Sequence, residues 1–318
     1  MERQRTIVEK NHFKDINQYV SPENSAYSKK ANTVVSFVYI ALSVIMFLPV
    51  LLVIIISFSS EDSINEIGYS FFPKGLSLKA YGYLFNSGGF LGRAFLNSLL
   101  ITAAGVAFGL MLMCPIAYAL SRKEYKLRRG ILLFLMIPML FSGGLVSSYM
   151  VNTQIFHLSN SYYALILPNL CSTWFIMILR NYFQNAIPDS LIEAAELDGA
   201  GHFQIFRLIV APVAKPVIMT VALFQTFNYW NSWYPSLLYL DSNHTELYPL
   251  QYVLVNMDRS IQTLVRDTQY LSGMNAYTPP TITIRMVMVV VVILPVMLIL
   301  PFFQQFLKRG MTVGAIKG

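Results

Sequence analysis

The chain contains an apolar run from Val34 to Ile56 without a single charged side chain. An α-helix rises about 1.5 Å per residue, so about 20 residues cross the hydrocarbon layer of a bilayer. The run is long enough for this. In lipid, a helix satisfies its own backbone hydrogen bonds, whereas an open strand or an exposed loop does not. We therefore expect residues 33–57 to form a membrane-spanning helix.

Five further stretches of the chain are similarly apolar. The whole sequence is 55% hydrophobic and 12% charged, whereas soluble domains are about 25% charged. One soluble core does not hide so many apolar side chains, because much of its surface has to be polar. The sequence therefore predicts an all-α, polytopic membrane protein of about six transmembrane helices within residues 33–306. The expected spans are 33–57, 94–120, 131–151, 162–180, 213–240 and 284–306.

The Lys and Arg residues indicate the orientation of the chain, because cytoplasmic loops of membrane proteins carry an excess of them. With residues 1–32 inside, 17 of the 23 Lys and Arg residues fall on the inner side and 6 on the outer side. We therefore expect both termini to be cytoplasmic, with an inner loop at 181–212, an outer loop at 241–283 and a C-terminal tail at 307–318. This topology accounts for the net charge of +7, and we expect no binding of nucleic acid.

The expected spans hold almost no ionisable side chains away from their ends. Carriers that couple transport to protons or ions usually keep such groups in mid-membrane. The sequence also contains no G-x-x-x-x-G-K-[ST] loop, no G-x-S-x-G elbow and no HExxH helix. We therefore expect no enzyme activity, no catalytic residue and no metal or cofactor bound by this chain. A stand-alone secondary carrier and a membrane scaffold or receptor stay open as alternatives.

The inner loop 181–212 has the pattern of two short helices that meet at a bend. Ser190 followed by Glu193 predicts a capping box, in which each side chain binds an unpaired backbone N–H at the helix start. Gly199 stands where the first helix should end, because glycine readily adopts the left-handed conformation of a helix C-terminus. The apolar residues from Ile205 to Val210 then indicate a second helix.

A bent helix pair of this kind is suited to enter a groove on another protein. Ala194 and Ala195 permit close approach, and Glu193 is available for an arginine of a partner. The alternative is an amphipathic hairpin that lies on the membrane surface.

The residues of this loop resemble a known family motif. Glu193-Ala194-Ala195, Asp198-Gly199-Ala200, Phe206 and Pro212, followed by Lys215-Pro216, resemble the EAA loop of ABC-importer permeases. Other segments are similar to the maltose-type carbohydrate permeases, namely Phe72–Tyr81, Asn97-Ser98, Ala117–Ser121 and Lys308–Gly318. Three more resemble a subgroup linked to oligosaccharides that contain uronic acids, namely Met139–Gly144, Trp230–Trp233 and Pro249–Tyr252.

The resemblance implies a type I ABC-importer permease fold and a non-catalytic pore subunit in a bacterial cell membrane. It implies four kinds of partner: a second homologous permease, two ATP-binding subunits that hold ATP and Mg, an extracellular or lipid-anchored solute-binding protein, and an oligosaccharide. The outer loop 241–283 would contact the binding protein, and the tail 307–318 would reach the ATPase dimer. A stand-alone secondary sugar carrier is the alternative. The residues expected to couple this chain to the ATPase are Glu193, Ala194, Ala195, Asp198, Gly199, Phe206 and Pro212.

Sugars are bound by amide and hydroxyl groups together with aromatic faces, which contact the apolar side of the ring. The fourth and fifth spans are rich in such residues. The same side chains also serve as anchors at the membrane interface or as bridges between helices, and these alternatives stay open. The residues expected to line a substrate pathway are Asn169, Trp174, Gln225, Asn228, Tyr229, Trp230 and Asn231.

Overall fold

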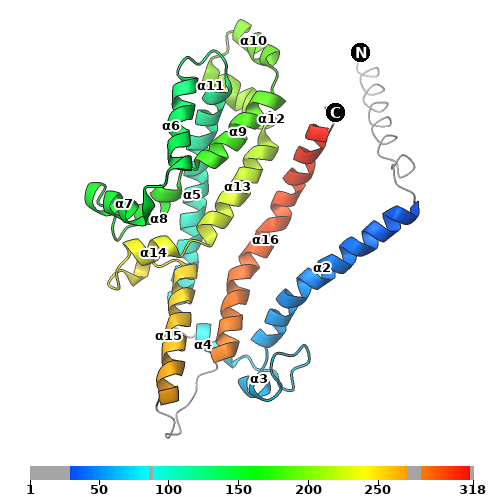
Figure 1. Cartoon of the computed structure of the whole chain (residues 1–318), viewed down its shortest axis with the longest axis vertical. Coiled ribbons are helices and arrows are strands. Elements are labelled where there is room, and N and C mark those ends of the chain that lie inside the picture. Colours follow the sequence, from blue (N-terminus) through cyan, green and yellow to red (C-terminus); the bar gives the residue numbers. More distant parts are fainter. Residues whose placement is uncertain (1–28, 86–88, 271–280, 316–318) are drawn as a thin grey trace.

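The computed structural model of the chain describes residues 29–85, 89–270 and 281–315 (Figure 1). These residues form helices joined by turns, and the isolated bridge between Ser59 and Leu76 is the one β pairing among them. Of the N-terminal segment expected at 1–32, residues 1–28 lie outside the described part, and the first helix already begins at Lys29. The C-terminal tail expected at 307–318 continues the last helix to Ala315, and residues 316–318 lie outside the described part.

Three helices are long and apolar enough to cross a membrane by themselves. They are α2 (Lys29–Ser57), α5 (Phe90–Ser121) and α16 (Thr281–Ala315), which correspond to the first, second and sixth expected spans. The helix α2 packs on α16, and its first half stands away from the other helices with almost every side chain exposed (Figure 1). An apolar helix without protein neighbours is suited to lipid, because lipid demands no polar surface.

The third expected span, 131–151, is broken in the structure. The helix α6 (Arg128–Leu140) ends before α7 (Gly144–Met150), which continues as a π-helix to Ile155 and turns by 116° from α6. Gly144 has a φ of 80°, which favours glycine, and it lies at the bend. Hydropathy alone did not reveal this break, because the short turn of Ser142 and Gly143 is averaged with the apolar residues on both sides.

The fourth and fifth expected spans are also bent. In the fourth, α8 (Tyr162–Ile166) and a 3-10 turn to Asn169 meet α9 (Thr173–Ala186) at 47°. The helix α13 (Lys215–Trp230) ends well before residue 240, and α14 (Tyr234–Tyr239) follows it. Pro235 lies in the first turn of α14 and has no N–H for a helical hydrogen bond back to residue 231, which agrees with the break. The described residues reach six candidate spans when each bent pair counts as one, and the third such pair is His202–Val213 with α13, which meet at 80°.

The loop expected at 241–283 contains a helix that the sequence analysis missed. After a 3-10 turn at Thr245–Leu247, α15 runs from Leu250 to Tyr270. Its residues Leu250, Val253 and Leu254 are buried at the helical spacing i, i+3, i+4, and the later residues Asp258, Arg259 and Gln262 are polar. The mean hydropathy of such an amphipathic helix is too low for a span, although its periodicity is helical.

Two apolar clusters hold the bundle together around the central helix α5. The first joins α5 and α16 to α15 through residues such as Ile101, Ile284 and Leu250. The second joins the other half of α5 to α9 and to a hairpin of residues 189–213, through residues such as Met113 and Phe183. We call the end of the bundle that carries this hairpin the hairpin end. The end that carries the short helices α3 (Glu61–Ile67) and α4 (Lys79–Phe85) is the opposite end (Figure 1).

Neutral side chains and one carboxylate fix the starts of α15 and α16 at the opposite end. The amide of Asn97 donates to the carbonyl oxygens of Glu246 and Tyr248 at 2.7 and 3.1 Å. The hydroxyl oxygen of Ser98 accepts the N–H of Leu250 at 2.8 Å. Likewise, the carboxylate of Glu61 accepts the N–H groups of residues 282 and 283 at 3.0 and 3.1 Å, which lie in the first turn of α16.

Candidate functional site

The hairpin begins with α10 (Asp189–Leu197) and turns sharply at Gly199. The N–H groups of Gly199 and Ala200 donate to the carbonyl oxygens of Glu196 and Ala195, both at 3.0 Å, which ends the helix. Gly199 has a φ of 83°, so the left-handed conformation predicted for it is present. The second arm consists of α11 (His202–Ile205), a π-helix to Val210 and α12 (Ala211–Val213).

The first helix of the hairpin does not start with the capping box that the sequence suggested. The residue before the helix is Pro188, and no side chain caps the helix there. Proline fixes an extended approach to the helix, which moves the start to Asp189 and places Ser190 inside the first turn. Asp189 instead places a carboxylate in the first turn, where it is favoured by the helix dipole.

The hairpin has a buried face and an exposed face. Ile192, Ala195, Ile205 and Val210 are buried in the second apolar cluster, against α5 and α9. The exposed face carries apolar side chains that contact little of this chain. Leu197 is 90% exposed, Phe203 is 74% exposed and Leu208 is 70% exposed. Apolar side chains displayed in this way commonly mark a surface that binds another protein or a membrane.

The seven expected coupling residues divide between these two faces. Ala195 and Phe206 point into the bundle, and the ring of Phe206 lies 5.5 Å from the ring of Tyr118 on α5. The other five are exposed, namely Glu193, Ala194, Asp198, Gly199 and Pro212. The alanine pair therefore does not form one surface: Ala195 joins the hairpin to the bundle, and Ala194 is presented outward.

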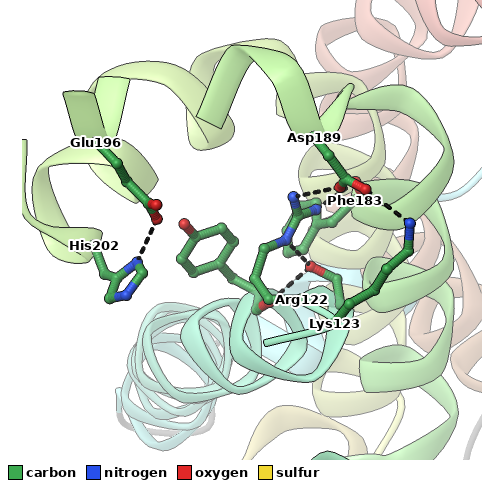
Figure 2. A network of polar contacts seen from close by, with 8 residues as sticks. Arg122, Lys123, Phe183, Asp189, Glu196 and His202 are labelled. Atoms are coloured by element: carbon green, nitrogen blue, oxygen red, sulfur yellow. Dashed lines mark hydrogen bonds and ion pairs between the residues drawn. The ribbon is translucent and has the colours of Figure 1, made fainter. Parts of the chain in front are cut away.

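A charged joint connects the start of the hairpin to the end of α5 (Figure 2). Lys123 Nζ donates to Asp189 Oδ2 at 2.9 Å, and Arg122 Nη1 lies 3.5 Å from Asp189 Oδ1. Arg122 also donates from Nη2 to the carbonyl oxygen of Phe183 at 3.1 Å and from Nε to the hydroxyl of Ser121 at 3.0 Å. The guanidinium thus ties together the ends of α5 and α9 and the start of α10.

The burial of this joint is uneven. The side chain of Arg122 is 9% exposed, whereas that of Asp189 is 48% exposed. A guanidinium removed from water needs its donors satisfied, and Arg122 finds acceptors on three elements. Its guanidinium also lies 5.6 Å from the ring centre of Tyr118, within reach of a cation–π contact. The buried half of the joint therefore resists separation more than the exposed half.

The hydrogen bond between Lys123 and Asp189 shifts the pKa values of both groups. The hydrogen bond from Lys123 lowers the pKa of the Asp189 carboxyl below its usual value. The same hydrogen bond raises the pKa of the Lys123 ammonium. Both groups are therefore charged at neutral pH.

A cavity of about 750 Å³ lies between the hairpin and the end of α5. Its lining includes Tyr118 and Arg122 from the α5 side and Glu193, Glu196 and His202 from the hairpin. His202 Nδ1 lies 3.6 Å from Glu196 Oε1, and this pair joins the two arms of the hairpin across the bend (Figure 2). The hairpin is therefore attached to α5 at its base, and the cavity separates its bend from α5.

Three of the expected pathway residues are buried and bridge helices. The amide of Gln225 donates to the carbonyl oxygen of Asn169 at 2.8 Å. The hydroxyl of Tyr229 donates to the carbonyl oxygen of Ile166 at 2.7 Å. The indole of Trp230 donates to the carbonyl oxygen of Val292 at 3.1 Å. The three side chains therefore bridge helices, as one alternative from the sequence has it, and their expected pathway function stays a prediction.

The other four expected pathway residues, Asn169, Trp174, Asn228 and Asn231, are exposed in this chain. Trp174 is 58% exposed at the start of α9, directly after the bend from α8. The amide of Asn231 donates to the carbonyl oxygen of Phe227 at 3.0 Å. The structure therefore separates the expected set into buried helix bridges and exposed side chains, and the pathway function of all seven stays a prediction.

The joint of Arg122, Lys123 and Asp189 was not predicted from the sequence. The two cations counted only as inner charges, because they directly follow the apolar stretch that ends at Ser121. Asp189 lies 67 residues after Arg122 and 66 residues after Lys123 in the sequence. A contact of this range has no local signal, so only the fold brings the three together. Among the described residues, no group of three His, Cys, Asp or Glu side chains could hold a metal ion.

The chain is similar to a family of known membrane proteins. Residues 25–313 match the family described as binding-protein-dependent transport system inner membrane component. Protein LplC of Bacillus subtilis (strain 168) is 35% identical over 276 residues, which cover 86% of this chain and 90% of that protein. The polygalacturonan/rhamnogalacturonan transport system permease protein YtcP of the same organism is 34% identical over 276 residues, covering 87% of this chain and 94% of YtcP.

A more distant relative and a solved structure extend these similarities. The arabinooligosaccharides transport system permease protein AraQ of Bacillus subtilis (strain 168) is 26% identical and covers 94% of this chain and 99% of AraQ. A crystal structure of a bacterial ABC transporter involved in the import of the acidic polysaccharide alginate contains a similar chain. Its TM-score is 0.74 at 24% identity, over 89% of this chain and 99% of that chain. These matches confirm the predicted all-α, polytopic permease fold and the predicted family resemblance.

Proposed function

We propose a coupling function for the hairpin, because this chain belongs to the family of binding-protein-dependent transport system inner membrane components. The chain is the permease subunit of an ATP-driven importer for an oligosaccharide. A second homologous permease completes the pore, two ATP-binding subunits hold ATP and Mg, and an external solute-binding protein delivers the sugar. The hairpin receives the movement of an ATP-binding subunit and passes it to the helices of the pore.

The two-faced burial of the hairpin carries this proposal. Ile192 and Ile205 anchor it in the bundle, so a displacement of the hairpin displaces α5 and α9 with it. On the other face, Leu197 and Phe203 are presented together with the carboxylate of Glu193. An apolar surface with a charged group suits a groove on a partner protein.

The proposed mechanism is alternating access. Closure of the ATP-binding subunits moves the hairpin as a rigid body, and the pore opens to the other side of the membrane. Reversing a two-state population from about 1:99 to about 99:1 requires a differential free energy of about 5.5 kcal/mol. A flexible tether would not transmit such a free energy. The joint at Arg122 and the apolar anchor of the hairpin supply the stiffness.

The orientation follows from the charges. The hairpin lies on the cytoplasmic side, as do both termini, because most Lys and Arg residues fall on that side. The helix α15 then lies on the outer side, where the binding protein arrives. The substrate is an oligosaccharide that contains uronic acids, and the supporting observation is the 34% identity to a permease named for polygalacturonan and rhamnogalacturonan.

Substitutions on the exposed face test the coupling function. Glu193→Ala removes the exposed carboxylate, and Gly199→Val places a β-branched residue at a φ of 83°. Both variants should reach the membrane, lose ATP-dependent uptake and fail to copurify with the ATP-binding subunit. Glu66→Gln is the matched control, since Glu66 pairs with Lys74 on an exposed surface at the opposite end. Normal uptake in the Glu193→Ala variant would exclude the coupling function.

A second experiment separates the importer from a stand-alone secondary sugar carrier. The purified chain alone, placed in liposomes with an oligosaccharide gradient, should not transport. Transport by the chain alone, without an ATP-binding subunit, would favour the carrier.

A further inference from the structure

A groove of about 570 Å³ lies between α15 and α16, at the end of the bundle opposite the hairpin. One wall is a polar stripe of α15, and the other is the first three turns of α16. The polar residues that line it are Gln251, Asp258, Arg259, Gln262 and Arg285, and an apolar floor is formed largely by residues 288–293 of α16. None of these residues belongs to the hairpin or to the pathway expected from the sequence.

The polar groups of this groove are arranged around one carboxylate. Asp258 Oδ2 accepts a hydrogen bond from Gln262 Nε2 at 2.6 Å. Asp258 Oδ1 lies 2.7 Å from Arg285 Nε, so the pair bridges α15 and α16. Both side chains are 37% exposed, which leaves them in contact with whatever fills the groove. Lipid is an unsuitable occupant, because half-exposed charges in lipid are costly.

Two buried polar atoms of the groove lack a partner among the residues that the structure describes. Gln251 Oε1 is an acceptor without a donor. Arg285 Nε has no hydrogen bond despite the nearby Asp258 Oδ1, because its N–H does not point at that oxygen. Buried polar atoms in native proteins are almost always satisfied, by protein, water or ligand. A hydroxyl group donates and accepts, so a polyhydroxylated ligand satisfies both atoms.

The apolar floor and the charge of the groove indicate which class of ligand it suits. A sugar ring combines hydroxyl edges with an apolar face, and the residues at 288–293 of α16 offer an apolar surface to that face. The described part of the lining carries two guanidinium groups and one carboxylate, a formal net charge of +1. Arg259 lies over the ring of Trp233 at 5.5 Å, which holds its guanidinium beside the groove. A guanidinium held in this way favours a carboxylate.

The groove is continuous with the helix that carries the expected pathway residues. Val292 lines the groove, and its carbonyl oxygen accepts the indole N–H of Trp230 on α13. Asn231, an exposed member of the expected pathway, is the next residue after Trp230. A ligand that leaves the groove along α16 therefore arrives at the polar end of α13.

We propose that the groove between α15 and α16 is a carbohydrate-binding subsite, in which sugar hydroxyls bind Gln251 and Arg285 and a uronate carboxylate binds Arg259. The inference rests on the proposed import function and on its orientation, and it adds the place on this subunit where the oligosaccharide is held and selected. A surface covered by another subunit of the importer is the competing use of the groove, and the experiment below distinguishes the two.

Cysteine labelling tests the subsite in the assembled importer in membrane vesicles. Val255 lines the groove, and Val255→Cys is a small change that is placed in a Cys171→Ser background, because Cys171 is exposed and Cys114 is buried. A membrane-impermeant thiol reagent should label this cysteine from the outer side. Oligogalacturonate should protect the cysteine at lower concentration than a neutral arabino-oligosaccharide. Failure to label would mean that another subunit or lipid covers the groove, and labelling without protection by either sugar would mean that no carbohydrate binds there.

A second variant tests the acidic selectivity. Arg259→Gln should raise the concentration of oligogalacturonate needed for protection by about tenfold, which is the effect of losing one charge-assisted hydrogen bond. The ratio between the acidic and the neutral sugar should fall accordingly. Lys74→Gln is the matched control, since Lys74 pairs with Glu66 outside the groove and its loss should leave protection unchanged. An equal weakening of both sugars by Arg259→Gln would overturn the selection of a carboxylate.

The two proposals fail separately. Protection from labelling requires no ATP turnover, so it is measured in the assembled importer with Glu193 unchanged. Uptake that survives Glu193→Ala contradicts the coupling function, whereas an unprotected cysteine at residue 255 contradicts the subsite.

Discussion

The two ends of the bundle are held together by different chemistry. At the hairpin end, the joint between α5 and α10 is an ion pair, in which a buried guanidinium and an exposed ammonium share the Asp189 carboxylate. At the opposite end, Asn97, Ser98 and Glu61 hold the starts of α15 and α16 by hydrogen bonds to backbone groups, and the half-exposed Asp258–Arg285 pair joins the two helices further along. Side chains that bind backbone groups fix a helix end locally. A salt bridge between two elements resists their relative movement and depends on pH and salt.

This difference agrees with what each end is proposed to do. The hairpin has to move together with α5, which requires a contact between side chains of distant segments. The starts of α15 and α16 have to stay in place, so that the groove between them keeps its shape. Substitutions at the two ends should therefore differ in size and in their response to pH.

Arg122→Met should have the largest effect of the changes considered. The variant leaves the carbonyl oxygen of Phe183 and the Oδ1 atom of Asp189 without the guanidinium. This loss should cost about 2–3 kcal/mol of stability. Uptake should fall by more than tenfold, and thermal unfolding of the purified protein should begin earlier. Arg122→Lys is the control, because it keeps the charge and loses the fork of donors. An Arg122→Met protein with the stability of wild type would mean that this joint is not the stiff element.

Asn97→Ala should have the second largest effect. The variant loses two donated hydrogen bonds and the acceptor for the Tyr162 hydroxyl at 2.9 Å, at a cost of about 1–2 kcal/mol. Hydrogen exchange should increase at residues 246–254, while the hairpin stays protected. Asn97→Asp keeps the acceptor and loses the donors, so it tests which bonds matter. Increased exchange at the hairpin instead would contradict the separation of the two ends.

The pH dependence of the Asp189 joint should be a smaller effect. Its carboxyl has a lowered pKa in the folded protein, so the stabilisation is present above the unfolded value of about 4 and is lost as the pH falls through the folded pKa. Lys123 has a raised pKa, so its contribution is lost only as the pH rises through that value, above about 10. The difference in melting temperature between wild type and Asp189→Asn should be constant from about pH 5 to 9 and shrink below pH 4. A constant difference down to pH 2 would show that the charge of Asp189 contributes nothing.

Lys123→Gln should have the smallest effect. Lys123 is exposed, and exposed ion pairs are screened by water and salt. Uptake should change less than twofold, and the change should disappear at high salt. If this variant were as damaging as Arg122→Met, the exposed half of the joint would be the stiff one, and the comparison between buried and exposed halves would have to be reversed.

The sequence determined the apolar stretches, the glycine bend of the hairpin and the family of the chain. These are local properties: a membrane span needs a run of apolar residues, and Gly199 stands at a position that favours the left-handed conformation. The breaks in the third and fifth spans were not predicted, because hydropathy is averaged over a whole segment. The third span has Ser142 and two glycines at its turn, and the fifth has Asn231 and Ser232 after α13, but the averaged hydropathy does not separate a straight helix from one that turns by 116°.

Only the tertiary structure decided what each polar side chain does. Tyr229 and Asn231 are both polar residues near the end of α13, yet Tyr229 is buried and bonded to α8, whereas Asn231 is exposed. Asp189 meets Arg122, and Asp258 meets Arg285, although no short-range pattern links either pair. The physical reason is that hydrophobicity is a property of a segment, whereas the partner of a polar group is decided by which distant segments the packed helices bring within hydrogen-bonding distance.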